Sequence, residues 1–300
     1  MRTRFIERLI EIARKDKNIL LLVGDLGYHS MDKFRDECSD QFLNCGISEQ
    51  NMINISAGLS MMGYNVCVYS IIPFLLQRPF EQIKINLCHD KNPVKLLGAG
   101  GGALYGGEGH THHAIEDIGL MRLLPNMRIV CPGTYQEMDG LFDDIMASDS
   151  PIYVRFGKKC DEKIYPKNIK FKLGKPNIVC EGKDVVIMTY GTMLPECYKA
   201  VKLLNIDGIY PTLISVHTIQ PLDEKMIMKE IGRHDHIIVV EDHRKTGGLG
   251  SSINLHDDYK IAFPDAFIDD VGDADYLYNK YGMTAEKIAK RIKKILTLNK

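Results

Sequence analysis

The segment from Cys45 to Gly58 places a carboxylate where it could do chemistry. Glu49 follows Gly46 and two further turn residues, and an apolar helical face begins at Met52. We therefore expect Glu49 at the N-terminus of a helix, where free backbone amides and the helix dipole favour an acidic side chain. An ordinary capping acid on a core helix would occupy the same position. A catalytic role and a capping role both remain open from this segment.

A glycine-rich segment followed by histidines is the second candidate site. Seven of the twelve residues from Gly98 to Gly109 are glycine, so the backbone can approach a ligand closely. Neutral imidazoles beyond it could donate hydrogen bonds to hydroxyl groups or exchange protons. A metal site is an alternative, although three ligands from one short loop seldom form a good tetrahedron. A mobile loop with surface histidines is another. The residues concerned are Glu108, His110, His112 and His113.

Phosphate recognition is weakly indicated elsewhere. Neither Gly100-Gly-Gly nor Gly247-Gly-Leu-Gly250 matches a dinucleotide-binding fingerprint, and the chain has no GxxxxGK[ST] loop. Arg155, on a predicted strand, could bind a phosphate through two parallel hydrogen bonds. A salt bridge at the rim of the fold would explain this arginine equally well.

Alternating strands and helices predict an α/β fold. Strands are expected at 18–26, 42–45, 65–72, 93–98, 128–131 and 152–156, then at 184–190, 210–215 and 236–241. Helices are expected between them, and such alternation is typical of parallel sheets. We predict two three-layer α/β/α domains with mostly parallel sheets, at residues 1–160 and 176–300, joined by a linker at 161–175. Asp25 ends the first strand, where open parallel sheets bind ligands.

The composition indicates a soluble, cytoplasmic protein. The 300 residues are 45% hydrophobic and 26% charged with a net charge of −1, which favours neither nucleic acid nor an anionic membrane as a partner. No apolar run has the length of a membrane span. The eight cysteines are scattered without metal-binding spacing and are expected to be reduced thiols.

Several motifs, taken in order, resemble those of thiamine-diphosphate enzymes of the transketolase superfamily. The segment Gly46-Ile-Ser-Glu49-Gln-Asn-Met is similar to the glutamate motif of that superfamily, and Phe74-Leu-Leu-Gln-Arg78 and Gly109-His-Thr-His112 follow in the expected order. In the second half, Thr218-Ile-Gln-Pro221 and Gly247-Gly-Leu-Gly250 resemble its C-terminal domain. The resemblance extends over essentially the whole chain.

Within this superfamily the chain resembles the C-terminal subunit of a split transketolase. The Gly-Asp-Gly motif that binds magnesium and diphosphate is missing, because Gly24-Asp25 is followed by Leu26. The resemblance implies that a separate N-terminal subunit holds Mg²⁺ and the diphosphate of thiamine diphosphate, in an α2β2 heterotetramer. It also implies transfer of a two-carbon ketol unit from a ketose or ketose phosphate to an aldose.

The resemblance assigns the cofactor-binding residues. Glu49 is expected to hydrogen-bond a ring nitrogen of the aminopyrimidine, and so to be both catalytic and cofactor-binding. Phe74 is expected to stack on that ring, although its spacing to Arg78 differs by one residue from that in some relatives. Asp25 matches an acid near the thiazolium end of the cofactor. Arg78 completes this predicted set.

The resemblance also assigns substrate-binding residues. His112 matches a catalytic histidine that hydrogen-bonds substrate oxygens, and Arg155 matches an arginine that binds the sugar phosphate. Three residues depart from the usual pattern, since Glu108 replaces an aspartate, His110 a proline and His113 a glutamine. We expect these three to contact the substrate and to suit a modified or unusual sugar.

Three alternatives remain open at this point. The chain could be the beta subunit of a 2-oxo acid dehydrogenase or resemble a deoxyxylulose-phosphate synthase, both acting on pyruvate. It could be a non-catalytic binding subunit. A metal-dependent hydrolase built on the histidine segment is the third, and it predicts activity of this chain alone that a chelator removes.

Overall fold

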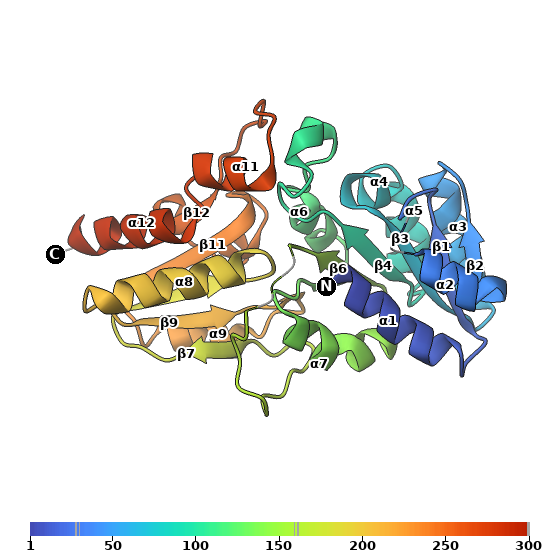
Figure 1. The fold of residues 1–300 in the computed structure, drawn as a ribbon, viewed down its shortest axis with the longest axis horizontal. Helices are drawn as coiled ribbons and strands as arrows, with labels where there is room; N and C mark the ends of the chain where they lie inside the picture. Colours follow the sequence, from blue (N-terminus) through green and yellow to red (C-terminus); the bar gives the residue numbers. More distant parts are fainter. Residues whose placement is uncertain (28, 30, 159, 161, 299–300) are drawn as a thin grey trace.

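The computed structural model describes residues 1–27, 29, 31–158, 160 and 162–298. Two α/β units lie side by side, with α1 and β1 to β6 in one and α8, α12 and β7 to β12 mainly in the other (Figure 1). The predicted fold class of two layered α/β domains with mostly parallel sheets is confirmed. None of the helices in the described part of the chain is both long and apolar enough to cross a membrane.

The first sheet has seven strands in the order β10-β5-β6-β4-β3-β1-β2. Its six N-terminal strands pair in parallel, whereas β10 comes from the second half of the chain and pairs antiparallel with β5. The first sheet is therefore completed by the C-terminal half. Its strands are β1 (Ile19–Val23), β2 (Phe42–Asn44), β3 (Asn65–Ile71), β4 (Lys95–Ala99), β5 (Arg128–Val130), β6 (Ile152–Phe156) and β10 (Thr218–Gln220).

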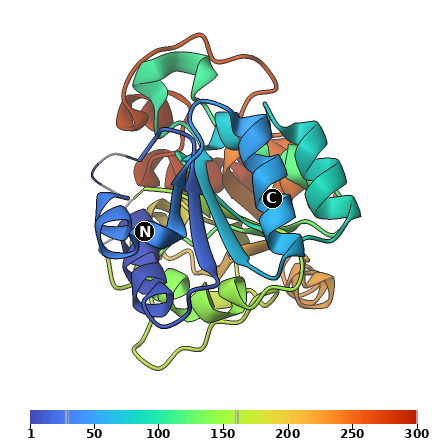
Figure 2. The same cartoon turned by 90° about the vertical axis from the view of Figure 1, so that its right-hand side faces the viewer.

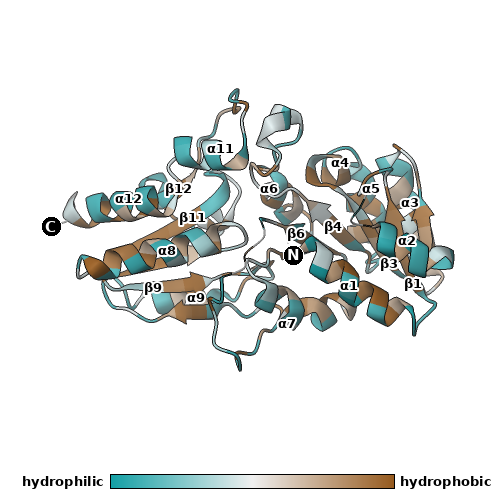
Figure 3. Cartoon of the chain, viewed as in Figure 1, coloured by the Kyte–Doolittle hydropathy of each residue, from teal (hydrophilic) through white to brown (hydrophobic). Residues whose placement is uncertain are grey.

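The second sheet has five strands in the order β12-β11-β8-β9-β7, and only the edge strand β7 is antiparallel to its neighbour. Figure 3 shows the strands mainly in the hydrophobic colour and the connecting loops mainly in the hydrophilic one, as expected for strands covered on both faces. These strands are β7 (Asn177–Cys180), β8 (Val185–Thr189), β9 (Pro211–Ser215), β11 (Ile237–Arg244) and β12 (Lys260–Phe263).

Helices cover both faces of the first sheet, as seen from the side in Figure 2. Successive strand residues face opposite layers: Leu21 packs with α1 and α7, whereas Leu22 packs with α3 and α4. On the α1 side, the rings of Phe5 and Phe142 meet with centroids 5.0 Å apart. These helices are α1 (Arg2–Ala13), α2 (Asp32–Glu37), α3 (Glu49–Met61), α4 (Ile72–Leu76), α5 (Phe80–Gln82), α6 (Asp117–Arg122) and α7 (Tyr135–Met146).

The two halves share one hydrophobic core. The cluster around Leu22 and Met52 continues through Tyr153 to Met188 and Val239 of the second sheet. A separate cluster packs α8 and α12 on the outer face of that sheet. The helices of this half are α8 (Met193–Ile206), α9 (Glu224–Ile231), α10 (Leu249–Ser252), α11 (Ala274–Lys280) and α12 (Ala285–Leu298).

Two sequence-based expectations differ from the structure in detail. The helix expected between the predicted strands at 65–72 and 93–98 consists of α5 followed by the π-helical segment η2 (Ile83–His89). The segment expected to link the domains packs against α7, since the Tyr165 hydroxyl donates to Glu137 Oε1 over 2.6 Å and Phe171 lies against Gly140.

Candidate active site

Glu49 is the first residue of α3, as predicted, and is only 5% exposed. The turn before it is built by Ser48, whose hydroxyl donates to Cys45 O over 2.7 Å, and by Gly46 in the left-handed region at φ 72°. The Arg78 guanidinium donates through Nη1 to Glu49 Oε1 over 2.9 Å. The helix N-terminus and the arginine both stabilise a carboxylate at this position, which can accept a hydrogen bond from a ligand.

Asp25 lies on the same edge of the sheet as this turn. Asp25 follows β1 and has a φ of 54°. Asn44, the last residue of the neighbouring strand β2, connects Asp25 to the turn before α3. Asn44 Nδ2 donates to Asp25 Oδ1 over 3.0 Å, and the backbone N–H groups of Asp25 and Gly46 both donate to Asn44 Oδ1, over 3.1 and 3.0 Å. Sequence reasoning missed Asn44, which carries this connection between the two predicted residues.

Phe74, Arg78 and His112 are brought together around one aromatic ring. Phe74 lies in α4, and the central carbon of the Arg78 guanidinium is 4.1 Å from its ring centroid. The imidazole of His112 meets the same ring edge-on, with centroids 5.0 Å apart. Glu49, Arg78, Phe74 and His112 therefore form one continuous chain of contacts, which joins residues predicted from three separate motifs.

The glycine-rich segment forms a closed loop that presents His112. We call residues 100–114 the histidine loop. Gly102 N–H donates to Ala114 O and Ala114 N–H donates to Gly102 O, both over 2.9 Å, and these bonds close its base. His112 Nδ1 lies 3.0 Å from Thr111 Oγ1, and the Tyr105 ring approaches the imidazole with centroids 6.4 Å apart.

The loop tip carries two predicted residues at the surface. The 3₁₀ helix η3 (Gly106–Thr111), interrupted at Gly109, exposes Glu108 and His110. They are accessible to a ligand or to another subunit.

His113 does not fit its predicted role in substrate contact. Its side chain is 2% exposed, and its hydrogen-bonding neighbour is the backbone of Gly106 in the same loop. Burial lowers the pKa of His113 below its usual value of 6.5, because the charged imidazolium would lose hydration. A neutral, buried ring packs the loop instead of facing a sugar. Among the described residues, no group of His, Cys, Asp or Glu is arranged to hold a metal ion.

Arg155 also requires a correction. The prediction that it binds a sugar phosphate is wrong for this fold, because its side chain is 1% exposed and its donors are already engaged. Nε donates to Asp117 Oδ2 over 2.7 Å, Nη1 to Asp242 Oδ1 over 2.6 Å, and Nη2 to Ala114 O over 2.9 Å. Arg155 is a buried structural ion between the two halves of the chain.

A further arginine near the histidine loop escaped sequence reasoning. Arg2 Nη1 donates to the Tyr69 hydroxyl over 2.8 Å, and its charge also interacts with the Tyr105 hydroxyl. Burial raises the pKa of Tyr69, against the opposing effect of the Arg2 charge. A lone arginine at position 2 carries no sequence signal of such a contact, because its partners lie on β3 and in the loop.

The fold and the site define a two-domain α/β subunit organised around a buried carboxylate at a helix N-terminus. The chain belongs to the transketolase family: residues 1–160 match the transketolase pyrimidine-binding domain, and residues 174–288 match the transketolase C-terminal domain. It is a subunit of a transketolase-type transferase, and relatives with these domains are themselves described as transketolase subunits.

Relatives of similar length carry the same arrangement. The chain is 35% identical to a subunit of the apulose-4-phosphate transketolase of Phocaeicola vulgatus, over 84% of this chain and 81% of the relative. It is 30% identical to a 6-deoxy-6-sulfo-D-fructose transketolase subunit from Clostridium sp. strain MSTE9, over 97% and 92%. A solved structure described as a split gene transketolase, inactive beta4 tetramer, superposes with a TM-score of 0.84 at 27% identity, covering 99% of this chain and 98% of that one.

Proposed function

We propose that this chain supplies the pyrimidine-binding half of a two-subunit transketolase that uses thiamine diphosphate. The reaction moves a two-carbon ketol unit from a ketose donor to an aldose acceptor. The observation that carries the proposal is the contact chain from the buried Glu49 carboxylate through Arg78 and Phe74 to His112.

The residues present fit the aminopyrimidine end of the cofactor. A flat heteroaromatic ring with a basic nitrogen requires a carboxylate and an aromatic or apolar face. Glu49 and Phe74 offer these two groups on neighbouring elements, α3 and α4. When bound, the cofactor supplies the carbon nucleophile and electron sink for breaking and forming the carbon–carbon bond.

The side chains of this subunit have separate roles in the proposed reaction. Glu49 would share a proton at its carboxylate with the ring nitrogen of the bound cofactor, and Arg78 holds one carboxylate oxygen in place. Phe74 orients the ring. His112, held between Phe74, Tyr105 and Thr111, donates to substrate oxygens. Asn44 holds Asp25 at the same edge of the sheet, where its carboxylate would lie toward the thiazolium end of the cofactor.

A second kind of subunit completes the active site. The sequence lacks the motif for magnesium and diphosphate, so these groups would be held by an N-terminal subunit in an α2β2 assembly. A related structure described as an inactive beta4 tetramer supports the need for such a partner. The non-catalytic alternative is disfavoured by the retained contact chain.

The proposed donors are ketose phosphates or other modified, anionic sugars. The names of two relatives refer to apulose 4-phosphate and to a sulfonated fructose. Glu108 and His110, which depart from the usual pattern, lie exposed at the loop tip, where they can set sugar specificity. A normal preference for xylulose and ribose phosphates would argue against sugar selection by these two residues.

The proposal is tested by co-purifying this chain with the product of a neighbouring gene. Thiamine diphosphate retention and two-carbon transfer from xylulose 5-phosphate, apulose 4-phosphate and sulfofructose are measured with and without Mg²⁺. Turnover only with both chains and Mg²⁺ is expected. Activity of this chain alone that is removed by a chelator would instead support a hydrolase, and turnover of pyruvate would support the other thiamine enzymes.

A further inference from the structure

The base of the histidine loop is held by buried groups from both halves of the chain. From the first half, Arg155 Nη2 donates to Ala114 O over 2.9 Å. From the second half, the Tyr278 hydroxyl accepts from Ala103 N–H over 3.3 Å and lies 3.4 Å from Asp242 Oδ2. Asp242 also accepts from Arg155 over 2.6 Å, so one network joins these groups. We call Tyr278 and Asp242 the loop clamp.

The packing against the clamp leaves no room for a side chain at Gly102. A Cβ atom added there would lie 2.4 Å from Asp242 Oδ2 and 2.8 Å from the Tyr278 hydroxyl oxygen. Gly102 also has a φ of 67°, which L side chains rarely adopt. The loop base therefore rests directly on two polar groups of the C-terminal half.

A second contact extends the same interaction toward the loop tip. Gly272 N–H donates to Gly106 O over 3.3 Å, and a Cβ at Gly106 would lie 2.4 Å from Leu277 Cδ1. The segment 272–278 thus runs beside residues 103–106, and α11 lies next to this part of the first half in Figure 1. His112 projects from the loop that this segment supports.

We propose that Tyr278 and Asp242 are positioning residues for sugar binding by the proposed transketolase. Both residues hold the base of the histidine loop in place, and the loop in turn holds the His112 imidazole in position. The C-terminal domain therefore determines how His112 is oriented toward the sugar. The cofactor contacts Glu49 and Phe74 lie on α3 and α4, outside the clamp. The inference deepens the proposed function and rests on it.

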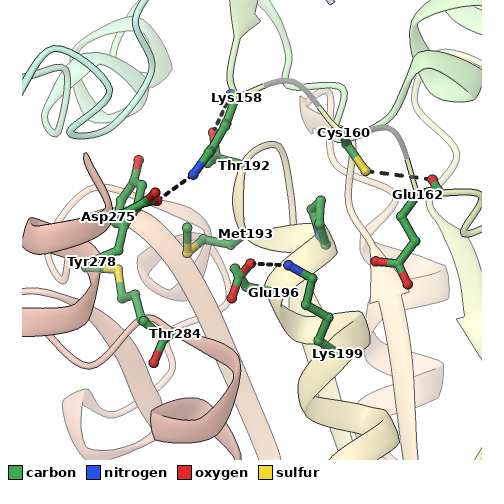
Figure 4. A pocket seen from close by; sticks show the side chains of 12 residues that line it. Lys158, Cys160, Glu162, Thr192, Met193, Glu196, Lys199, Asp275, Tyr278 and Thr284 are labelled. Carbon is green, nitrogen blue, oxygen red and sulfur yellow. Dashed lines mark hydrogen bonds and ion pairs between the residues drawn. The ribbon is translucent and has the colours of Figure 1, made fainter. Parts of the chain in front are cut away.

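A pocket beside the clamp makes a clean test feasible. Tyr278 lines a pocket of about 340 Å³ between α8 and α11, together with Met193, Met283 and Lys158 (Figure 4). Tyr278→Phe keeps the ring and removes only the hydroxyl that contacts Ala103 N–H and Asp242. Tyr281→Phe is the matched control, since its hydroxyl bonds the partly exposed Asp270, over 2.7 Å, away from the loop.

The experiment compares both variants with the wild type in the assembled two-subunit enzyme. For Tyr278→Phe we expect kcat/KM for the donor sugar to fall about 3- to 10-fold, the effect of one hydrogen bond, with thiamine diphosphate affinity within about twofold. Amide hydrogen exchange of the peptide containing Ala103 should quicken, because its N–H loses its acceptor. Tyr281→Phe should change none of these quantities.

Four results would overturn the inference. A lower melting temperature with unchanged KM, kcat and loop exchange would leave Tyr278 with a purely structural role. Equal losses of cofactor affinity and donor kcat/KM would show that the clamp does not act on the sugar step. Absence of two-carbon transfer in the wild-type complex would overturn the proposed function, and with it the role in sugar binding, whereas unchanged exchange would overturn the clamp itself.

Discussion

At the scale of single residues, Glu49 carries the strongest prediction. Glu49→Gln keeps the size and the hydrogen-bonding oxygen of the side chain but cannot hold a proton in the same way. We expect two-carbon transfer to fall by about 10²- to 10⁴-fold, the range of a lost general acid–base group. Steady-state kinetics of the assembled enzyme measures this loss.

The control for Glu49 is Glu81→Gln, which changes an exposed glutamate on the nearby α5. It should leave both activity and subunit association unchanged. Size-exclusion chromatography of both variants with the partner subunit separates lost chemistry from lost assembly. Full activity of Glu49→Gln would refute the proposed proton exchange.

His113 predicts a pH dependence of stability. Burial lowers the pKa of its imidazole in the folded protein below the usual 6.5. Between the lowered pKa and 6.5 the folded state therefore binds fewer protons than the unfolded state. The free energy of unfolding is highest above about pH 6.5, falls as the pH decreases toward the lowered pKa, and levels off below it. Urea unfolding from pH 8 to pH 5 should show this fall.

The matched variant His113→Gln should flatten that pH profile in part. A remaining slope is expected, because burial also lowers the pKa of His217. A profile identical to that of the wild type would show that His113 is not the responsible group.

At the scale of elements, the histidine loop depends on individual glycines. Gly102→Ala places a Cβ 2.4 Å from Asp242 Oδ2 and strains a positive φ, so we expect loss of stability by about 1–3 kcal/mol and loss of ketol transfer. Gly107→Ala in the same loop meets nothing within 4 Å and should be tolerated. The melting temperature and kcat/KM for the donor sugar are measured for both variants. Equal values for the two variants would contradict the close packing of the loop base against Asp242 and Tyr278.

Elements with a strong apolar pattern were predictable from the sequence. β6 has the bounds expected, and α3 begins at the predicted Glu49. The three-residue strand β10 was not foreseen, because only its pairing with β5 makes it a strand. The helix α11 was missed because its short, mostly polar sequence lacks a clear apolar period.

Site residues were predictable where a local motif contains them. The prediction failed where charged groups far away in the sequence determine the role of a residue. Phe74 contacts His112, and Arg78 connects Phe74 to Glu49, while the roles assigned to these residues stay predictions. The role of Arg155 depends on Asp117 and Asp242, which are 38 and 87 positions away in the sequence. Local pattern could not separate a phosphate-binding arginine from one neutralised by two buried carboxylates.

At the scale of the whole molecule, the two halves are structurally interdependent. β10 of the second half completes the first sheet, the Leu22 core cluster continues to Val239, and Arg155 meets Asp242 across the boundary. A cut between the halves would expose an apolar core and leave a buried charge without its partner, which costs about 3–5 kcal/mol. Sequence-defined domains need not be independent folding units.

This interdependence predicts a single unfolding transition for the full chain. Circular dichroism and tyrosine fluorescence, available because the chain has 14 Tyr and no Trp, should give coincident urea curves. A fragment of residues 1–175 should lack cooperative unfolding, since it loses β10 and Asp242, while co-expression with residues 176–300 should restore it. Two separate transitions, or a cooperative isolated fragment, would show that the shared sheet and the buried Arg155 network do not couple the two halves.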